Sequence, residues 1–129
     1  MTYEEIARAF SGHRFDVALD SIAPEAVWDL VGEDRVEGRE AIAEVCRRST
    51  EATSDVETTW VRFVSVAAGD LVAVDAVGRY TGPDDVSTVS SCDIYEFEDG
   101  LIVKITSYAV ELPSLGAPAD SDGSGSSSR

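Results

Sequence analysis

VWDLVGEDRVEGREAIA, residues 27–43, is the stretch that decides the fold. Residues 26–31 are mostly apolar and rich in β-formers, which predicts a short strand. Residues 32–38 run from glycine to glycine through four charged residues and predict a loop. Residues 39–52 predict a helix, because apolar and small residues recur there on one side at helical spacing. The stretch therefore predicts a strand that passes through a charged loop into a helix.

Two further helices are predicted before this strand. Thr2 and Glu5 form a capping box, in which each side chain can bond the other residue's backbone amide. The helix that follows carries an apolar face and should stop at Gly12. A second helix is predicted over residues 15–22, whose apolar residues recur at helical spacing, and Pro24 should break it.

After residue 56 the pattern becomes strand-like, with regular turn signals. Strands are predicted over residues 56–67, 71–80, 86–97 and 101–112, joined by turns at Gly69-Asp70, at 81–85 and at Glu98-Asp99-Gly100. Four consecutive antiparallel strands form a meander. Residues 1–112 thus predict one α+β domain, a cone-shaped, curved antiparallel sheet packed against three N-terminal helices. Such a cone leaves an open cavity suited to an apolar ligand.

The composition narrows the classes of function. The chain has 129 residues and a net charge of −15, from 25 acidic and 10 basic residues. This charge disfavours nucleic acid and anionic membrane surfaces as partners. No apolar stretch is long enough to span a membrane and the acidic N-terminus does not suggest a secretory signal, so cytoplasm is the expected location. Residues 113–129 are rich in Ser, Gly and Asp and predict a disordered tail.

Metal and disulfide chemistry are not indicated by the sequence. Cys46 and Cys92 form no disulfide framework, and their spacing fits no metal motif. They are expected to be ordinary core thiols. His13 is the only histidine and lies in the turn between the first two helices, where it is expected to end a helix. We therefore expect neither a metal nor a cofactor.

Two motifs carry a family resemblance over about residues 5–112. Residues 27–32 and 38–43 resemble the V-x-D-x-x-G and G-R-E-x-I-A segments of ketosteroid isomerases, a branch of the nuclear transport factor 2-like superfamily. Gly12 lies seventeen residues before Asp29, where that family has a glycine. Residues 92–97, followed by Gly100-Leu101-Ile102, are similar to the family's hydrophobic-Asp-x-x-x-Phe hairpin.

The resemblance implies roles for two aspartates. Asp29 would be the general base that moves a proton next to a carbonyl, and its removal should cost on the order of 10²-fold or more in rate. Asp93 would be a protonated acid that donates a hydrogen bond to the developing oxyanion, since an apolar pocket raises a carboxyl pKa. The family also uses a tyrosine on the first helix. That position is Glu5 here, and Tyr3 lies about 200° away around the helix.

Asp75 invites a second comparison. Limonene epoxide hydrolases resemble this chain in having an aspartate on the same strand, but Ala73 and Ser107 replace two of their other key residues. Asp75 could equally form a structural ion pair with an arginine of another strand, such as Arg62.

Glu57 invites a third comparison. Polyether epoxide-opening cyclases, like SnoaL-like polyketide cyclases, use carboxylates in the same cone, and the pair Asp29 and Glu57 roughly suits their pattern. Alternatively, Glu57 is solvated at the start of a strand. Asp29 has its own alternative, a surface residue that caps a turn.

Strand alternation predicts the cavity lining. If Asp93 faces the cavity, Ser91 and Tyr95 face it too, whereas Thr106 and Tyr108 should face outward, into a dimer contact. The two tryptophans could instead be core aromatics. The predicted pocket residues are Phe10, Phe15, Trp28, Trp60, Ser91, Tyr95, Ile105, Ser107 and Ala109.

Three functional hypotheses remain open. The first is a cofactor-free acid/base enzyme on an apolar substrate, of the isomerase or polyketide/polyether cyclase type, with Asp29 and Asp93 central and Asp75 or Glu57 auxiliary. The second is a non-catalytic small-molecule-binding or accessory protein with the same cup. The third is an epoxide hydrolase. In each case we expect an apolar small-molecule partner and a homodimer.

Overall fold

The computed structural model describes residues 1–113, so the predicted tail lies, apart from Pro113, outside the described residues. Its helices are α1 (Tyr3–Ser11), α2 (Phe15–Ala18), the 3-10 turn η1 (Leu19–Ser21) and α3 (Arg39–Ala52). Its strands are β1 (Ile22–Leu30), β2 (Arg35–Glu37), β3 (Glu57–Ala68), β4 (Leu71–Thr81), β5 (Val86–Glu98) and β6 (Leu101–Leu112). Among these residues, no helix is both long and apolar enough to cross a bilayer.

The six strands form one sheet in the order β2-β1-β6-β5-β4-β3. The predicted meander is confirmed, since β3 to β6 pair antiparallel in sequence order. The sheet is nevertheless mixed, because β1 runs parallel to β6 and antiparallel to β2. The sequence did not predict this parallel pair, because the pairing depends on where the chain returns after the meander. The α+β class and the curved sheet are confirmed.

The first helix begins and ends where the sequence predicts. The Thr2 hydroxyl accepts from the Glu5 amide at 3.1 Å, and the Glu5 carboxylate accepts from the Thr2 amide at 2.8 Å. At the other end Gly12 caps the helix, and His13 follows with φ +67°. Histidine is among the residues that enter this left-handed region more often than most. The turn aims the next helix back across the sheet.

The second helix is shorter than predicted. It ends at Ala18 and tightens into η1, and the chain enters β1 at Ile22. Pro24 therefore lies inside a strand and not at a helix end. Its place is the stretch where the β1–β6 register shifts, between Ile22 and Val27. Proline lacks a backbone donor and is tolerated in sheets at such irregular positions. The predicted charged loop also contains the short strand β2, which the sequence did not reveal.

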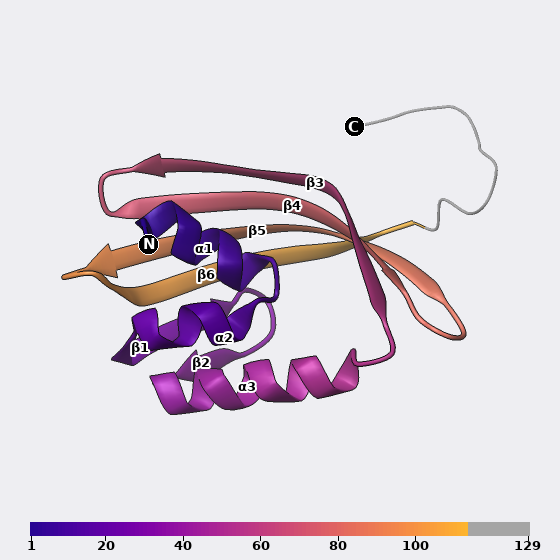
Figure 1. The fold of residues 1–129 in the computed structure, drawn as a ribbon, viewed down its shortest axis with the longest axis horizontal. Coiled ribbons are helices and arrows are strands. Elements are labelled where there is room, and N and C mark those ends of the chain that lie inside the picture. Colours follow the sequence, from indigo (N-terminus) through magenta and orange to yellow (C-terminus); the bar gives the residue numbers. More distant parts are fainter. Residues whose placement is uncertain (114–129) are drawn as a thin grey trace.

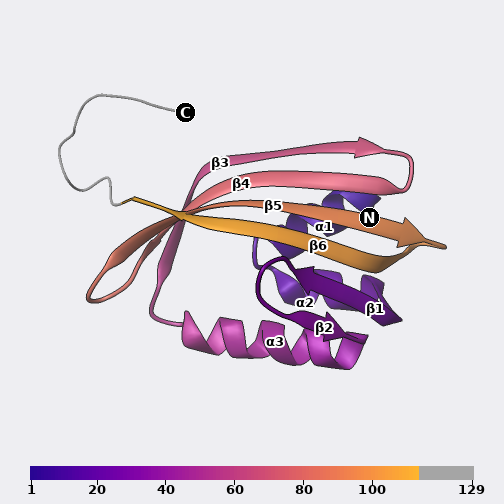
Figure 2. The ribbon, with the colours of Figure 1, turned by 180° about the vertical axis from the view of Figure 1, so that it is seen from behind.

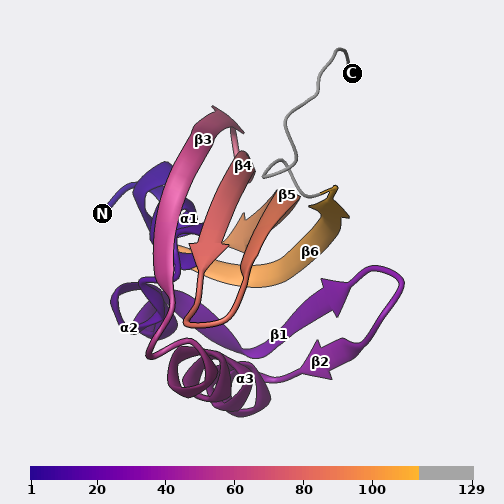
Figure 3. The same cartoon turned by 90° about the vertical axis from the view of Figure 1, so that its right-hand side faces the viewer.

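The helices cover one side of the sheet (Figure 1). Figure 1 shows them gathered on the same side of the long strands, with α1 packed on β3 to β5 and α3 on β1 and β2. Seen from behind, the opposite face of β3 to β6 is not covered by a helix of the described chain (Figure 2). Figure 3 shows that the sheet is strongly curved and unclosed. This curvature is what leaves room for a cavity between helices and strands.

The core fills the space between helices and sheet. Its largest fully buried side chains come from β1, α3, β4, β5 and β6, and the helices α1 and α2 add phenylalanines. The main members are Phe10, Phe15, Ile22, Ile42, Cys46, Val72, Val74, Tyr95, Phe97, Ile102 and Ile105. Cys46 is buried and Cys92 half-buried, both as free thiols. On β5 and β6 this apolar core borders the polar side chains of Ser91, Asp93 and Ser107.

Gly78 allows two aromatic side chains to meet over β4. A Cβ at Gly78 would lie 2.9 Å from Trp60 Cζ3 and 2.9 Å from the Tyr80 hydroxyl oxygen. We expect Gly78→Ala to lower the free energy of unfolding by about 1–3 kcal/mol, the usual cost of overpacking. Urea denaturation measures this loss. The matched control is Gly82→Ala, where the nearest atom is 3.4 Å away, and a change of similar size there would contradict the steric explanation.

Candidate functional site

A cavity of about 230 Å³ opens between the α1–α2 turn, β1 and the inner faces of β4 to β6. Its walls are mostly aromatic and aliphatic, with hydroxyl groups and one carboxyl at the floor. The lining residues are Phe10, Ser11, His13, Phe15, Trp28, Leu30, Ser49, Tyr80, Val89, Ser91, Asp93, Ser107, Tyr108 and Ala109. An apolar site with a few convergent polar groups is typical of a small-molecule pocket.

Asp93 is the only carboxyl among these lining residues. It lies on β5 opposite Ser107 of β6. Alternation along the strand turns its side chain toward the helices, on the same face as Ser91 and the buried Tyr95. Its two oxygens have different partners. Ser11 donates to Oδ2 at 2.7 Å, and Ser107 donates to Oδ1 at 2.6 Å. The carboxyl is therefore held from both sides by hydroxyls of α1 and β6.

The two serines connect Asp93 to further polar groups. The Trp28 indole Nε1–H donates to Ser107 Oγ at 2.8 Å. Ser11 Oγ lies 2.6 Å from the Tyr95 hydroxyl oxygen, and Tyr95 is completely buried. Five side chains from three strands and one helix thus form a continuous hydrogen-bonded chain that is centred on Asp93.

Burial raises the pKa of Asp93 above the ordinary carboxyl range. The hydrogen bonds from Ser107 and Ser11 and the nearby His13 act in the opposite direction, but burial is the largest effect. A raised pKa brings a carboxyl closer to neutral pH, where it can both take up and release protons. Perturbed carboxyls of this kind in a pocket are typical of functional sites.

His13 stands at the rim of the same cavity. Its ring is stacked 5.6 Å from Phe15 and 5.9 Å from Tyr80, and meets Trp60 edge-on at 5.5 Å. Burial lowers the pKa of His13, and the Asp93 charge partly opposes this shift. The imidazole is therefore held mostly neutral at pH 7. Sequence reasoning assigned His13 to a helix end, which is where it lies, but missed that its ring lines the cavity.

Tyr80 completes this aromatic rim. It lies on β4, two residues after Gly78, so its side chain points to the same face of the sheet as Gly78, the face that lines the cavity. Burial, with a smaller contribution from the Asp93 charge, raises the pKa of Tyr80, so it stays a neutral phenol. The rim therefore offers flat, uncharged surfaces to a ligand above the polar floor.

The predicted pocket residues divide into two groups. Six of the nine line the cavity: Phe10, Phe15, Trp28, Ser91, Ser107 and Ala109. Tyr95 and Ile105 lie beneath it in the core, and Trp60 supports its rim through His13. Tyr108, predicted to face outward, is half exposed and also borders the cavity. Ser11 was missed, because nothing in the sequence marks a serine at the end of a helix as a carboxylate partner.

The structure does not bring Asp29 and Asp93 together. Trp28 and Leu30, its neighbours on β1, both line the cavity, so alternation turns Asp29 to the other face. In the sheet register its backbone lies opposite Arg35 of β2 and beside Thr106 of β6. The sequence pattern predicted the strand β1 correctly, but the face to which the Asp29 side chain points depends on the register of β1 with β6.

This placement gives a direct test of the base role predicted for Asp29. Because Asp29 lies outside the cavity lining, we expect Asp29→Asn to leave ligand binding and turnover within about twofold of wild type. A loss of 10²-fold in turnover would instead restore the general-base role.

The other two acidic candidates also lie away from the cavity lining. Asp75 forms an ion pair with Arg62, with Oδ2 2.9 Å from Nε, on the outer face of β4 and β3. The structural alternative for Asp75 is thus what the structure shows. Glu57 is exposed at the start of β3, opposite Thr81.

The hydroxyl that helix α1 contributes to the site does not come from the position where ketosteroid isomerases have their tyrosine, which is Glu5 here. Glu5 is engaged in the capping box, and Tyr3 stacks on Phe97 at 4.0 Å and accepts from the Gly100 amide at 3.1 Å. Neither residue lines the cavity. Ser11, at the last turn of the helix, is the α1 hydroxyl that reaches the carboxyl.

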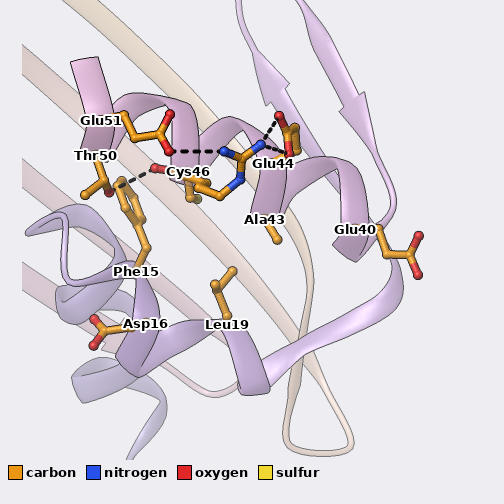
Figure 4. Close-up of a pocket in the computed structure, with 10 residues that line it drawn as sticks. Phe15, Asp16, Leu19, Glu40, Ala43, Glu44, Cys46, Thr50 and Glu51 are labelled. Carbon is orange, nitrogen blue, oxygen red and sulfur yellow. Dashed lines mark hydrogen bonds and ion pairs between the residues drawn. The ribbon is translucent and has the colours of Figure 1, made fainter. Parts of the chain in front are cut away.

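A larger and more open hollow lies between α2 and α3 (Figure 4). It has a volume of about 640 Å³ and an apolar floor that includes Phe15, Leu19 and Cys46. Its acidic rim is partly paired, since Arg47 bridges Glu44 and Glu51. Burial raises the pKa of the Cys46 thiol to about 12, so it stays unreactive. The hollow therefore offers apolar surface without a reactive group among its described lining.

No group of three or more His, Cys, Asp or Glu side chains among residues 1–113 is placed to hold a metal ion. The polar groups of the cavity are instead one carboxyl, hydroxyls, an indole and an imidazole. These can bind an oxygen-bearing organic ligand and exchange a proton with it.

Comparisons with known proteins agree with this geometry. Residues 3–105 match the sequence profile described as SnoaL-like domain. A search of curated proteins returns no match. Among solved structures, an NTF2-like protein of unknown function from Cytophaga hutchinsonii is 24% identical, with a TM-score of 0.72 over 82% of this chain and 94% of that chain.

Two other similar structures carry functional names. A proposed polyketide cyclase from Xanthomonas campestris pv. campestris is 21% identical, with a TM-score of 0.63 over 80% of this chain and 83% of that chain. An LEH-like epoxide hydrolase from M. tuberculosis is 22% identical, with a TM-score of 0.61 over 84% of each chain. At these identities the likeness shows the fold alone. With most of its length matched by the family profile, the chain belongs to the SnoaL-like domain family, within the nuclear transport factor 2-like superfamily.

Proposed function

We propose that the protein is a cofactor-free acid/base enzyme that acts on a small apolar carbonyl compound, with Asp93 as the group that takes up and returns the proton. The observation that carries this proposal is a single, largely enclosed carboxyl at the floor of an aromatic cavity. A general acid/base must exchange a proton near the working pH and stand within reach of the substrate; the upward direction of the Asp93 pKa shift and its place in the cavity wall both favour this role.

The cavity argues for a compact ligand. Its volume of about 230 Å³ falls below the roughly 300–1,000 Å³ typical of drug-sized ligand sites. Its rim is flat and uncharged, which favours a planar, conjugated ring system over a charged metabolite. Isomerisation by proton transfer next to a carbonyl, or ring closure through such an enolate, fits these properties. These are reactions of the isomerase and polyketide-cyclase type.

A spectroscopic titration tests the proposal. Phenols such as 2-naphthol or the larger equilenin imitate an enolate intermediate, and their absorption reports whether they bind as phenol or phenolate. We expect a binding signal with wild type that Asp93→Ala weakens by at least tenfold. Asp75→Ala, a matched loss of an aspartate on the outer face, should change binding less than twofold. Absence of binding to wild type would count against the proposal.

A non-catalytic binding protein is the second candidate, favoured by the capping-box role of Glu5 where related isomerases carry a tyrosine. The two candidate functions differ in the pKa that they require of the Asp93 carboxyl. NMR titration of the Asp93 carboxyl carbon should give a midpoint clearly above the usual value near 4. An ordinary midpoint would favour the binding protein.

We also propose that the protein forms a homodimer through the outer face of the sheet. Val64 and Val66 of β3, Leu71 of β4 and Val110 of β6 are large apolar side chains that are exposed in the single chain. Exposed apolar groups in such number suggest a protein contact, and a second copy fits a broad sheet face. Val66→Lys should shift the sedimentation coefficient of the wild-type dimer towards that of a monomer. A monomeric wild type would contradict the proposal.

A further inference from the structure

The polar chain around Asp93 has a direction that the donors and acceptors impose. An indole Nε1–H can only donate, so Ser107 Oγ must accept the bond from Trp28. A serine hydroxyl has one proton and two lone pairs. When Asp93 is ionised, Ser107 donates that proton to Oδ1 at 2.6 Å and keeps one lone pair free. In this state Ser107 offers no donor to the cavity.

The other side of Asp93 is fixed by Tyr95. Among the described residues, the hydrogen bond of the Tyr95 hydroxyl is to Ser11, at 2.6 Å, and Tyr95 is completely buried. Because Ser11 gives its proton to Asp93 Oδ2, Tyr95 must donate to Ser11. Reversing this order would turn the Tyr95 proton into the apolar core without an acceptor. That cost disfavours the reversed order by roughly tenfold or more.

A proton taken up by Asp93 therefore faces Ser107 and not Ser11. With the proton on Oδ1, Asp93 donates to Ser107 Oγ, which still accepts from Trp28. Both lone pairs of Ser107 are then occupied, and its own proton must point elsewhere. Ser107 and Trp28 both line the cavity, so the cavity is the open direction.

We propose that Ser107 is a catalytic residue, the hydroxyl that donates a hydrogen bond to the substrate oxygen, and that it turns toward the cavity when Asp93 is protonated. This inference rests on the proposed function and adds to it the oxyanion donor. Trp28, Ser11 and Tyr95 are then positioning residues, because they act through Ser107 and Asp93.

This hydrogen-bonded arrangement couples proton uptake by Asp93 to hydrogen-bond donation by Ser107 during proton abstraction. As a substrate C–H bond next to the carbonyl breaks, its proton bonds to Asp93 Oδ1 and the electron pair moves to the carbonyl oxygen. Once the new O–H turns toward Ser107 Oγ, the Ser107 hydroxyl is free to donate to that oxygen and stabilise its negative charge. The return of the proton to another carbon reverses both changes. Donors that become available only as charge develops favour the transition state over the substrate.

Ligand binding by Ser107 variants tests this proposal. Ser107→Ala should weaken phenolate binding, with 2-naphthol as the probe, by roughly 10- to 100-fold, as expected for the loss of a bond to a charged oxygen. Ser107→Thr keeps the hydroxyl and should stay within about threefold of wild type. The matched control is Ser90→Ala on the outer face of β5, which should have no effect. If Ser107→Ala binds as tightly as wild type while Asp93→Ala does not, Asp93 contacts the ligand directly and Ser107 has only a structural role.

A second measurement needs no ligand. The indole N–H resonance of Trp28, assigned with Trp28→Phe, should titrate with the same midpoint as the Asp93 carboxyl, since both act on Ser107. In Ser107→Ala this common midpoint should disappear. An indole signal that does not follow Asp93 in wild type would overturn the inference. If wild type binds no phenol yet the two midpoints coincide, the proposed function fails and the hydroxyl switch stands.

Discussion

Replacing Asp93 by asparagine is expected to lower the turnover of a carbonyl substrate by about 10²- to 10⁴-fold, the usual contribution of general acid/base catalysis. Asparagine keeps the size of the side chain and, like the protonated acid, offers one acceptor oxygen and one donor group, but it cannot take up a proton. The cavity should therefore keep its shape, and KM should change far less than kcat. Steady-state kinetics measures both, and an Asp93→Asn variant with wild-type kcat would exclude Asp93 as the acid/base group.

The same substitution should increase stability at neutral pH. Burial raises the pKa of Asp93, so the folded protein holds this proton more tightly than the unfolded chain does. The resulting stabilisation is fully present below the unfolded pKa and is lost as the pH rises through the higher folded pKa. Above that range wild type contains a buried charge that Asp93→Asn lacks. Melting temperatures of the two proteins should therefore diverge as the pH rises from 4, and an equal pH dependence would contradict the raised pKa.

Phe10→Ala is expected to have the largest effect on stability, a loss of about 3–5 kcal/mol in the free energy of unfolding. Phe10 is 3% exposed and meets Phe15, Trp28 and Tyr95 edge-on, with ring centroids 5.1, 5.1 and 6.1 Å away. Removing this ring leaves a void among groups that cannot easily close over it.

Urea denaturation measures this loss. Val17→Ala on α2 is the control, since Val17 is 38% exposed and its loss should cost far less. A Phe10→Ala variant within about 1 kcal/mol of wild type would contradict this prediction and show that the cavity wall can collapse into the void.

The fold was largely predictable from local signals. The capping box and Gly12 gave the bounds of α1, and Glu98-Asp99-Gly100 gave the hairpin between β5 and β6, where Asp99 and Gly100 adopt positive φ. Each of these signals acts over a few residues, which is why single-sequence reasoning finds it. The parallel β1–β6 pair and the short β2 strand depend on contacts between distant segments.

The site was less predictable than the fold. The inward positions of Asp93 and Ser107 followed from the hairpin motif and strand alternation, because both depend on a regular period of two. Asp29 shows the limit of that reasoning, since one position along β1 decides which face it joins. His13 and Ser11 lie in and beside a turn, where no period applies, so only the folded chain reveals that they reach the cavity.

Phe15 lines both the cavity and the open hollow between α2 and α3, so its side chain belongs to the walls of both spaces. The size of the residue at this position, the first of a four-residue helix, therefore affects both spaces. A smaller residue there is expected to thin the wall between the two spaces and to let the cavity admit a longer ligand. Position 15 is therefore a natural starting point for changing the length of ligand that the cavity accepts, because it lies in the wall and not in the hydrogen-bonded network around Asp93.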